Sequence, residues 1–368
     1  MKKQKVASLL LAIVVVGEAQ GLGKSCSTTD RTDGLCVRIK DCPPIHEKMQ
    51  KVIHGSGTQS SLFDVVRAFC SDSTLVCCAL ADIQLNETQT EPPSGMSLLP
   101  KNCGRARTPP VSLGPAPLGA WPWIVILRAR YNREIFPICG GSLISERYVL
   151  TSSHCHSPES TFDLISATVG EYNVRGSPDC DSRGCAPPPQ EIPIERTIPH
   201  PKGPCLNCKH TDIALMRLSS RVQMYDGFVQ PICLPVNPTQ DMGFSVQDLE
   251  GKRAWGAGWG DTLGDSNSTV LPDVPVQLEV PIQTLPPCLL MKNRFLDKAS
   301  AFCAGGEGND FCKGDSGNPL TLTNDAGNRV FLIGIVSSGQ GKCGADGTQS
   351  LYTNVSYYVP WILSNLEP

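Results

Sequence analysis

The sequence lacks an apolar run long enough to cross a membrane, and it lacks an excess of charge of either sign. It has 32 Lys and Arg residues against 35 Asp and Glu residues, which gives a net charge of −3. The two kinds of charge are interspersed, so no electrostatic footprint for nucleic acid is present. The one long apolar run, from Val6 to Val16, is too short to span a bilayer. We therefore expect neither a nucleic-acid partner nor a membrane anchor.

The residues around this apolar run are typical of a secretory signal peptide. Lysines precede the run, and Gly17-Glu18-Ala19 follows it as a small-x-small cleavage site. We therefore expect residues 1–19 to be a signal peptide and the mature protein to be secreted and extracellular.

Cysteine, in contrast, is abundant. The sequence has 18 cysteines, an even number, which predicts an oxidising compartment and a framework of disulfides. Glycosylation sequons begin at Asn86, Asn267 and Asn354, and each is a candidate site of a secreted glycoprotein.

Residues 25–79 hold six of the cysteines in a segment too short to bury much apolar area. Cross-links there must substitute for a core, so the segment is expected to be a small disulfide-rich module. The sequence alone leaves the pairing open. Residues 80–110 follow as a linker, because Glu91-Pro92-Pro93-Ser94-Gly95 cannot hold a helix or a central strand.

From Trp121 onward, short runs of strand-forming residues alternate with turn signals, which predicts an all-β domain. We expect strands at residues 123–130, 148–151, 165–169, 192–198, 213–218, 274–282, 331–337 and 351–354, and a terminal helix at 357–365. The pattern has no long crossovers between parallel strands, which argues against the unrelated serine-hydrolase folds.

The candidate nucleophile lies in Gly314-Asp315-Ser316-Gly317. A serine hydroxyl attacks a carbonyl only when a base removes its proton and when N–H groups await the developing oxyanion. Glycines beside Ser316 leave that approach open, so the N–H groups of Gly314 and Ser316 are the expected oxyanion hole. The same tetrapeptide could also be an ordinary surface turn, because all four residue types favour turns.

Two further segments supply the partners that the serine needs. His154 follows one apolar run and Asp212 opens another, and the chain order His, Asp, Ser is that of a catalytic triad on a double barrel. We therefore expect His154 to be the general base and Asp212 to orient and stabilise its imidazole, with acyl transfer to water as the reaction.

The motifs together resemble a trypsin-like serine protease. They are Cys139-Gly140-Gly141-Ser142, the segments around His154 and Asp212, Gly258-Trp259-Gly260, and Gly314-Asp315-Ser316-Gly317. The cysteine spacing of residues 25–79, which ends in the vicinal Cys77-Cys78, resembles an arthropod clip domain. The resemblance implies an all-β double six-stranded β-barrel over residues 111–368 with a short C-terminal helix, preceded by the clip domain and by an activation region within residues 80–110.

The resemblance also implies roles for further residues. Asp315 would pair with the N-terminal ammonium that activation cleavage frees, and Ser337 would support Asp212. Asp310 would lie at the base of the primary substrate pocket and select Arg or Lys, with Ser337, Gly339 and Ser350 also lining the substrate site. Otherwise Asp310 would be a solvated loop acid.

The sequence departs from the family pattern at four places. Ser350 and Asn318 stand where relatives usually carry glycine, and Ser338 replaces a tryptophan. The stretch after Arg107 reads Thr108-Pro109-Pro110, where active relatives begin with Ile or Val. Proline has a fixed φ and no N–H, so this terminus suits ammonium insertion poorly.

The resemblance implies a set of disulfide pairs. They are Cys26–Cys77, Cys36–Cys70, Cys42–Cys78, Cys103–Cys233, Cys139–Cys155, Cys180–Cys185, Cys205–Cys208, Cys288–Cys303 and Cys312–Cys343, of which Cys205–Cys208 is assigned as the remainder. The spacing of the four cysteines from Cys180 to Cys208 would also suit zinc, although oxidation is expected in a secreted chain.

No cofactor is required for this chemistry, but a structural calcium ion is a candidate. Glu171 resembles the start of a calcium loop, and Asp179 and Asp181 could supply further oxygen ligands. The alternative is a solvated acidic loop.

The sequence thus predicts a secreted trypsin-like endopeptidase, made as a zymogen, that cleaves after Arg or Lys in a cascade of immunity, clotting or melanisation. Its expected partners are a protein substrate, an upstream activating protease, a serpin inhibitor and a docking partner of the clip domain. The alternative is a catalytically impaired clip-domain homologue that acts as a binding or cofactor protein, which the atypical Thr108-Pro109-Pro110 favours.

Overall fold

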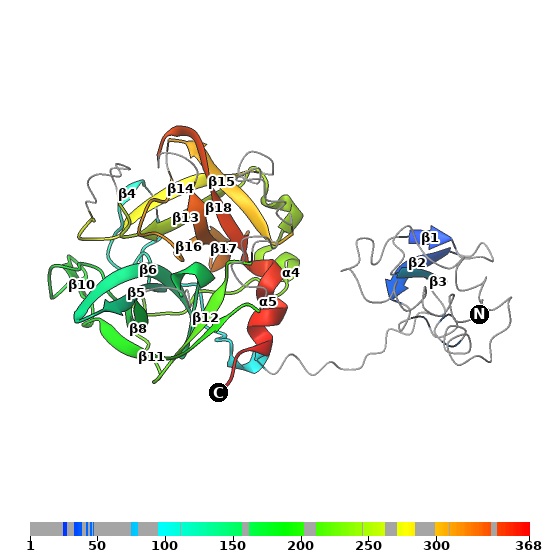
Figure 1. Ribbon diagram of the computed structural model, residues 1–368. Helices are drawn as coiled ribbons and strands as arrows, with labels where there is room; N and C mark the ends of the chain where they lie inside the picture. Colours follow the sequence, from blue (N-terminus) through cyan, green and yellow to red (C-terminus); the bar gives the residue numbers. More distant parts are fainter. Residues whose placement is uncertain are drawn as a thin grey trace. The chain divides into compact units, whose positions relative to one another are not determined.

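The computed structural model describes part of the chain. The described residues are 25–27, 33–38, 42, 45, 47, 75–79, 95–110, 112–156, 162–201, 211–244, 246–261, 271–283, 299–308, 310–339 and 344–368. The chain divides into two compact units, Met1–Glu91 and Pro92–Pro368 (Figure 1).

The first unit contains a small antiparallel sheet. It is formed by β1 (Ser25–Ser27), β2 (Asp33–Arg38) and β3 (Leu75–Ala79) in the order β1-β2-β3. Cys42 and Cys77 are buried and disulfide-bonded. The expected disulfide-rich module is therefore present, while the three pairings predicted for it lie outside the described side chains.

The second unit begins with a closed antiparallel barrel in the order β11-β12-β7-β6-β5-β8 (Figure 1). Its strands are β5 (Ile124–Tyr131), β6 (Glu134–Ser145), β7 (Tyr148–Thr151), β8 (Asp163–Val169), β11 (Gln190–Pro199) and β12 (Ala214–Leu218). Leu127, Leu143 and Leu215 are fully buried in one cluster. The apolar runs of the sequence thus close around a shared interior.

The second barrel has the order β13-β16-β17-β18-β15-β14, and β13 closes it by pairing with β14. Its strands are β13 (Arg253–Gly258), β14 (Val276–Gln283), β15 (Ala301–Glu307), β16 (Pro319–Thr323), β17 (Val330–Gly339) and β18 (Asp346–Asn354). The short β4 (Gly114–Pro115) adds to the edge of β14. The predicted pair of six-stranded barrels is confirmed.

Short elements complete this unit, with α5 at its end. They are η3 (Met96–Leu98), η4 (Ser153–Cys155), β9 (Cys180–Asp181), β10 (Gly184–Cys185), α4 (Pro238–Met242), η5 (Val246–Leu249) and α5 (Val355–Ser364). The helix α5 lies beside β17 and buries Val355, Val359 and Ile362 (Figure 1). Among the described helices, none is long and apolar enough to span a membrane.

The start of α5 corrects one expectation from the sequence. Asn354 is only 6% exposed, and its Nδ2 donates to the carbonyl of Ala299 at 2.9 Å. The nitrogen that a glycan would modify is thus engaged inside the fold, so the Asn354 sequon does not suit glycosylation. The sequons at Asn86 and Asn267 lie outside the described residues.

Candidate active site

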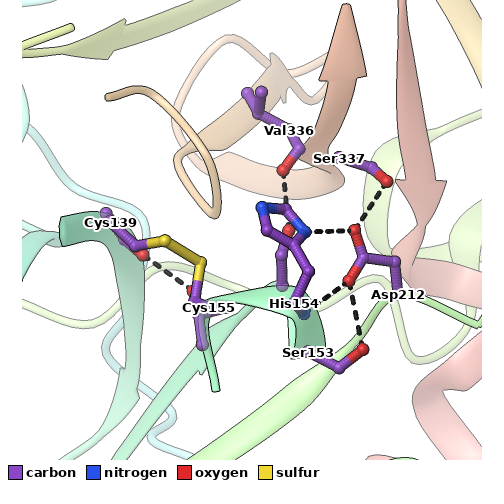
Figure 2. Close-up of a disulfide and its surroundings, with 10 residues drawn as sticks. Cys139, Ser153, His154, Cys155, Asp212, Val336 and Ser337 are labelled. Carbon is purple, nitrogen blue, oxygen red and sulfur yellow. Dashed lines mark hydrogen bonds and ion pairs between the residues drawn. A yellow bond between two sulfur atoms is a disulfide. The ribbon is translucent and has the colours of Figure 1, made fainter. Parts of the chain in front are cut away.

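Strand pairing in the first barrel brings His154 and Asp212 together. Strand β12 pairs antiparallel with β7, with Ala214 opposite Thr151. The residues before Ala214 and those after Thr151 therefore leave the paired strands at the same end. His154 lies in η4, directly after β7. The Cys139–Cys155 disulfide anchors this turn to β6 (Figure 2).

The carboxylate of Asp212 accepts hydrogen bonds from three neighbouring residues (Figure 2). The Nδ1–H of His154 donates to Oδ2 at 2.7 Å, and the backbone N–H of His154 donates to Oδ1 at 2.9 Å. The hydroxyl of Ser337 donates to Oδ2 at 2.6 Å, and that of Ser153 donates to Oδ1 at 3.1 Å. These bonds fix the imidazole with its Nε2 as the acceptor.

The electrostatics of this pair suit a general base. Burial raises the pKa of Asp212, but the charge and hydrogen bonds of His154, with the bond from Ser337, outweigh burial and lower that pKa to about 2. Burial lowers the pKa of His154, but the hydrogen bond and charge of Asp212 outweigh it and raise that pKa above its ordinary value. Asp212 is therefore ionised at neutral pH and stabilises the imidazolium.

The segment of Ser316 is docked against the His154 segment from one side through Gly140. The Gly140 N–H donates to the carbonyl of Ser316 at 2.8 Å, and the Gly140 carbonyl accepts from the hydroxyl of Thr151 at 2.7 Å. Gly317 must be glycine here, because it has φ +84° and a Cβ would lie 2.2 Å from Thr151 Oγ1.

A second contact fixes the same segment from β17. The N–H of Gly317 donates to the carbonyl of Val336 at 2.9 Å, and that carbonyl also accepts from the hydroxyl of Ser152 at 2.7 Å. Val336 lies beside His154 in Figure 2. The Ser316 segment is thus linked to Thr151 through Gly140 and to Ser152 through Val336. Thr151 and Ser152 directly precede Ser153 and His154.

The loop before Ser316 presents N–H groups for an oxyanion. Gly314 has φ +102°, and the Asp315 N–H donates to the carbonyl of Cys312 at 3.0 Å, which closes the turn. Within the part of the chain that the structure describes, the N–H groups of Gly314 and Ser316 donate to no other group. These are the two predicted oxyanion donors.

Asp315 is buried behind this loop. Its carboxylate accepts from the N–H groups of Gly260 at 2.9 Å and Cys312 at 3.0 Å, and from Nδ2 of Asn318 at 3.0 Å. Burial raises the pKa of Asp315 to about 6 although these bonds lower it.

Asp310 is also buried, next to the other residues predicted to line the substrate site. The N–H of Phe311 donates to its carboxylate at 2.8 Å, and burial raises the pKa of Asp310 to about 6 against the lowering effect of the hydroxyl of Ser350 and of Phe311. Gly339 pairs with Ser350 across β17 and β18. Asp310, Ser350 and Gly339 are thus brought together, while Ser337 lies against Asp212.

The acidic loop offers two carboxylates for a cation. Glu171 accepts from the N–H of Tyr172 at 3.0 Å, and burial and the charge of Asp179 raise the pKa of Glu171. Asp181 instead binds Arg107 at 3.2 Å and Arg183 at 3.0 Å. Among the described acidic side chains, no third carboxylate joins Glu171 and Asp179. Glu171 and Asp179 are thus the two carboxylates that could contribute to a calcium site, which stays a prediction, because Ca²⁺ also takes backbone carbonyls and water as ligands.

Three of the disulfides that the resemblance implies have both cysteine side chains among those described. Cys103–Cys233, Cys139–Cys155 and Cys180–Cys185 are formed, and Cys303 and Cys312 are disulfide-bonded. The Cys180–Cys185 bond removes these two sulfurs from the zinc alternative. Cys205–Cys208 and the partners Cys288 and Cys343 lie outside the described residues.

Sequence reasoning did not predict several contacts around the site. Ser153 binds the Asp212 carboxylate, and the hydroxyl of Thr353 donates to the Asp212 carbonyl at 2.8 Å. Asn318 was identified only as a departure from glycine, and its bond to Asp315 was not foreseen. Ser153 stands next to His154 in the sequence, which is a signal that could have suggested it.

Comparison with known proteins gives the same assignment for both units. A family model described as Trypsin matches residues 111–362, and one described as Regulatory CLIP domain of proteinases matches residues 26–78. The chain is 33% identical to Serine protease ea of Drosophila melanogaster, over 93% of this chain and 91% of that protein. It is 34% identical to Phenoloxidase-activating factor 3 of Holotrichia diomphalia, over 97% of this chain and 99% of that protein.

A solved structure also matches over nearly the whole chain. The crystal structure of the Drosophila Grass clip serine protease of the Toll pathway has a TM-score of 0.60 and 30% sequence identity, and the match covers 93% of this chain and 97% of that chain. The chain belongs to the clip-domain serine proteases of arthropods, a branch of the trypsin family.

Proposed function

We propose that the protein is a secreted serine endopeptidase that cleaves after Arg or Lys in an extracellular proteolytic cascade. The observation that carries this proposal is the hydrogen-bonded pair of His154 and Asp212 with the Ser316 segment docked beside it. A pure binding protein would not need this arrangement of base, orienting carboxylate and nucleophile.

The reaction proceeds by acyl transfer. His154 Nε2 takes the proton of the Ser316 hydroxyl while Oγ bonds to the carbonyl carbon of the substrate, and the oxyanion receives hydrogen bonds from the N–H groups of Gly314 and Ser316. The imidazolium, stabilised by Asp212, gives the proton to the leaving amine as the peptide C–N bond breaks. Water then attacks the acyl-enzyme by the same steps in reverse and frees Ser316.

Asp310 supports the preference for a basic side chain. The carboxylate buried beside Phe311 and Ser350 is costly to ionise, and a guanidinium or ammonium group of the substrate offsets that cost. Arg and Lys are therefore preferred before the cleaved bond.

The relatives support a place in a cascade. Two are named Phenoloxidase-activating factor 3 and Phenoloxidase-activating enzyme, and one is named Melanization protease 1. A protease of this kind has a protein substrate and an upstream activating protease. The other proposed partners are a serpin that inhibits the protease and a protein that docks on the clip domain. The signal-like residues 1–19 support secretion.

A second function is a binding protein without catalysis. Two observations favour it: Thr108-Pro109-Pro110 suits ammonium insertion poorly, and the Arg107 side chain, which an activator would have to engage, is only 17% exposed.

The two functions are separated by a substrate assay on the secreted full-length protein. The protein is treated with a trypsin-like activator, the cut is verified by N-terminal sequencing, and matched peptide substrates with Arg, Lys, Leu or Glu before the reporter group are compared. Hydrolysis of the Arg and Lys substrates alone, absent in Ser316→Ala, supports the endopeptidase. If protein with a verified cut hydrolyses none of the substrates, the binding function remains. If it hydrolyses the Leu substrate as fast as the Arg and Lys substrates, the role of Asp310 is contradicted.

A further inference from the structure

Asn318 lies two residues after the candidate nucleophile and is 2% exposed. Its Nδ2 donates to the Asp315 carboxylate at 3.0 Å, and its backbone N–H donates to the Asp315 carbonyl at 3.0 Å. One residue therefore holds both the side chain and the backbone of Asp315.

The surroundings of this pair are shaped to fit it. A Cβ at Gly140 would lie 1.7 Å from Asn318 Oδ1, and a Cβ at Gly258 would lie 2.0 Å from Asn318 Nδ2 and 2.1 Å from Asp315 Oδ1. A Cβ at Gly260 would lie 2.2 Å from the same carboxylate. Three glycines from two other segments thus leave the space that the carboxamide and the carboxylate fill.

This contact exists in a chain that has not been cut. By the family resemblance, Asp315 acquires its partner only after cleavage, when a new N-terminal ammonium reaches it. Here the Asp315 carboxylate already receives three N–H donors, from Gly260, Cys312 and Asn318. In the described part of the molecule, the N–H groups of Gly314 and Ser316 are also already free for an oxyanion.

We propose that Asn318 is a positioning residue that replaces the activation ammonium, holding Asp315 and through it the Gly314 and Ser316 N–H groups, so that the uncleaved chain can be acylated at Ser316. This inference rests on the proposed endopeptidase function. It also accounts for Thr108-Pro109-Pro110, because a new N-terminus that does not have to insert beside Asp315 can carry prolines.

The test is the rate at which a fluorophosphonate probe labels uncut full-length protein. A reducing gel separates uncut chain from cut catalytic chain, so the labelled band identifies the reactive form. Wild type is compared with Asn318→Gly, the residue that relatives carry, and with Asn318→Leu, which keeps the branched shape without the donor. Asn132→Gly, in the exposed turn between β5 and β6, is the matched control.

We expect the probe to label the uncut bands of wild type and Asn132→Gly. The labelling rate of uncut Asn318→Gly and Asn318→Leu is expected to fall about ten- to a hundredfold, because each variant loses one hydrogen bond to a charged group. Wild type that is labelled only after cleavage overturns the inference and leaves the proposed function intact. Equal labelling rates of uncut wild type and Asn318→Gly also overturn it. A fall in labelling rate that is explained by a lower melting temperature of the variants does so too. No labelling of any wild-type form contradicts both.

Discussion

At the scale of single residues, the site depends on how a buried carboxylate is kept charged. Asp212 is 2% exposed and still ionises, because His154, Ser153 and Ser337 all donate to it. A carboxylate so placed serves chemistry through its partner: it fixes the tautomer of the imidazole and favours its protonated form.

Asp212→Asn should change both the rate and its pH dependence. The charge of Asp212 raises the pKa of His154, so its loss lowers that pKa and moves the acid limb of the kcat/KM profile to lower pH. The rate at neutral pH should fall about 10⁴-fold, because the amide favours the wrong tautomer. A pH–rate profile of the active protein measures both effects. The exposed Asp163→Asn should change neither, and an acid limb that stays in place or moves to higher pH would contradict the coupling.

Asp310 makes a separate pH prediction for ligand binding. Its pKa of about 6 means that the carboxyl becomes neutral as the pH falls through 6, so a cationic ligand loses its counter-charge there. The Kd of benzamidine, measured by calorimetry on Ser316→Ala protein, should rise about tenfold between pH 8 and pH 5. In Asp310→Asn the affinity should be weak and independent of pH, whereas Asp325→Asn should behave as wild type. A pH-independent Kd with Asp310 present would place this acid away from the ligand.

Residues that belong to a recognisable motif were predictable from sequence, whereas the contacts that Asn318 and Asn354 make inside the fold were not. Gly314-Asp315-Ser316-Gly317 became identifiable once His154 and Asp212 preceded it in the chain order of a catalytic triad. The bond from Asn318 to Asp315 also needs the space at Gly140 and Gly258, which come from other strands. The hydrogen bond of Asn354 likewise needs the carbonyl of Ala299, which comes from a distant segment.

At the scale of elements, the short strands followed from apolar runs between turn signals. Strands β7 and β12 occupy the expected positions to within one residue because each is a compact run of strand formers. Strand β18 begins at Asp346, five residues before the expected Leu351, because its pairing with β15 and β17 extends it. The long strand β6 was not expected, since Pro137 and Gly140-Gly141 interrupt its pattern. Its partners β5 and β7 hold it in the barrel despite these residues.

The β9–β10 hairpin holds the predicted activation segment around Arg107 and Thr108. Asp181 binds the Arg107 guanidinium at 3.2 Å, and that guanidinium lies 4.6 Å from the ring centroid of Phe228. Arg183 of the same hairpin donates to the hydroxyl of Thr108 at 2.7 Å. Contacts therefore restrain both sides of the Arg107–Thr108 bond.

Asp181→Ala should make this bond easier to cut. A protease of trypsin-like specificity must withdraw the arginine from Asp181 into its own pocket, so losing this partly exposed ion pair should speed cleavage about two- to fivefold. A time course with N-terminal sequencing measures the rate after Arg107. Asp163→Ala, which removes the exposed pair with Arg130, is the control. An unchanged rate after Arg107 would mean that the hairpin does not restrain the segment.

At the scale of the whole molecule, one disulfide decides what cleavage releases. Cys103 lies before Arg107 and is bonded to Cys233 in the protease unit. A cut after Arg107 therefore leaves the N-terminal part covalently attached. A docking module that stays attached can keep an active protease at its site of action.

The Cys103→Ser/Cys233→Ser double variant should separate the two parts. After cleavage, wild type should run as one species on a non-reducing gel and as two on a reducing gel, whereas the double variant should run as two on both. Uncut double variant, which should migrate as one chain, controls for degradation. Release of the N-terminal fragment from cut wild type under non-reducing conditions would contradict the tether.

The proposed catalysis requires that His154 and Asp212 turn the Ser316 hydroxyl into a nucleophile. The measurement is mass spectrometry of the full-length protein after fluorophosphonate treatment, because the adduct can be located on one residue. We predict a single adduct on Ser316, strongly reduced in His154→Ala and absent in Ser316→Ala. A protein that stays unmodified both before and after verified cleavage would contradict the account.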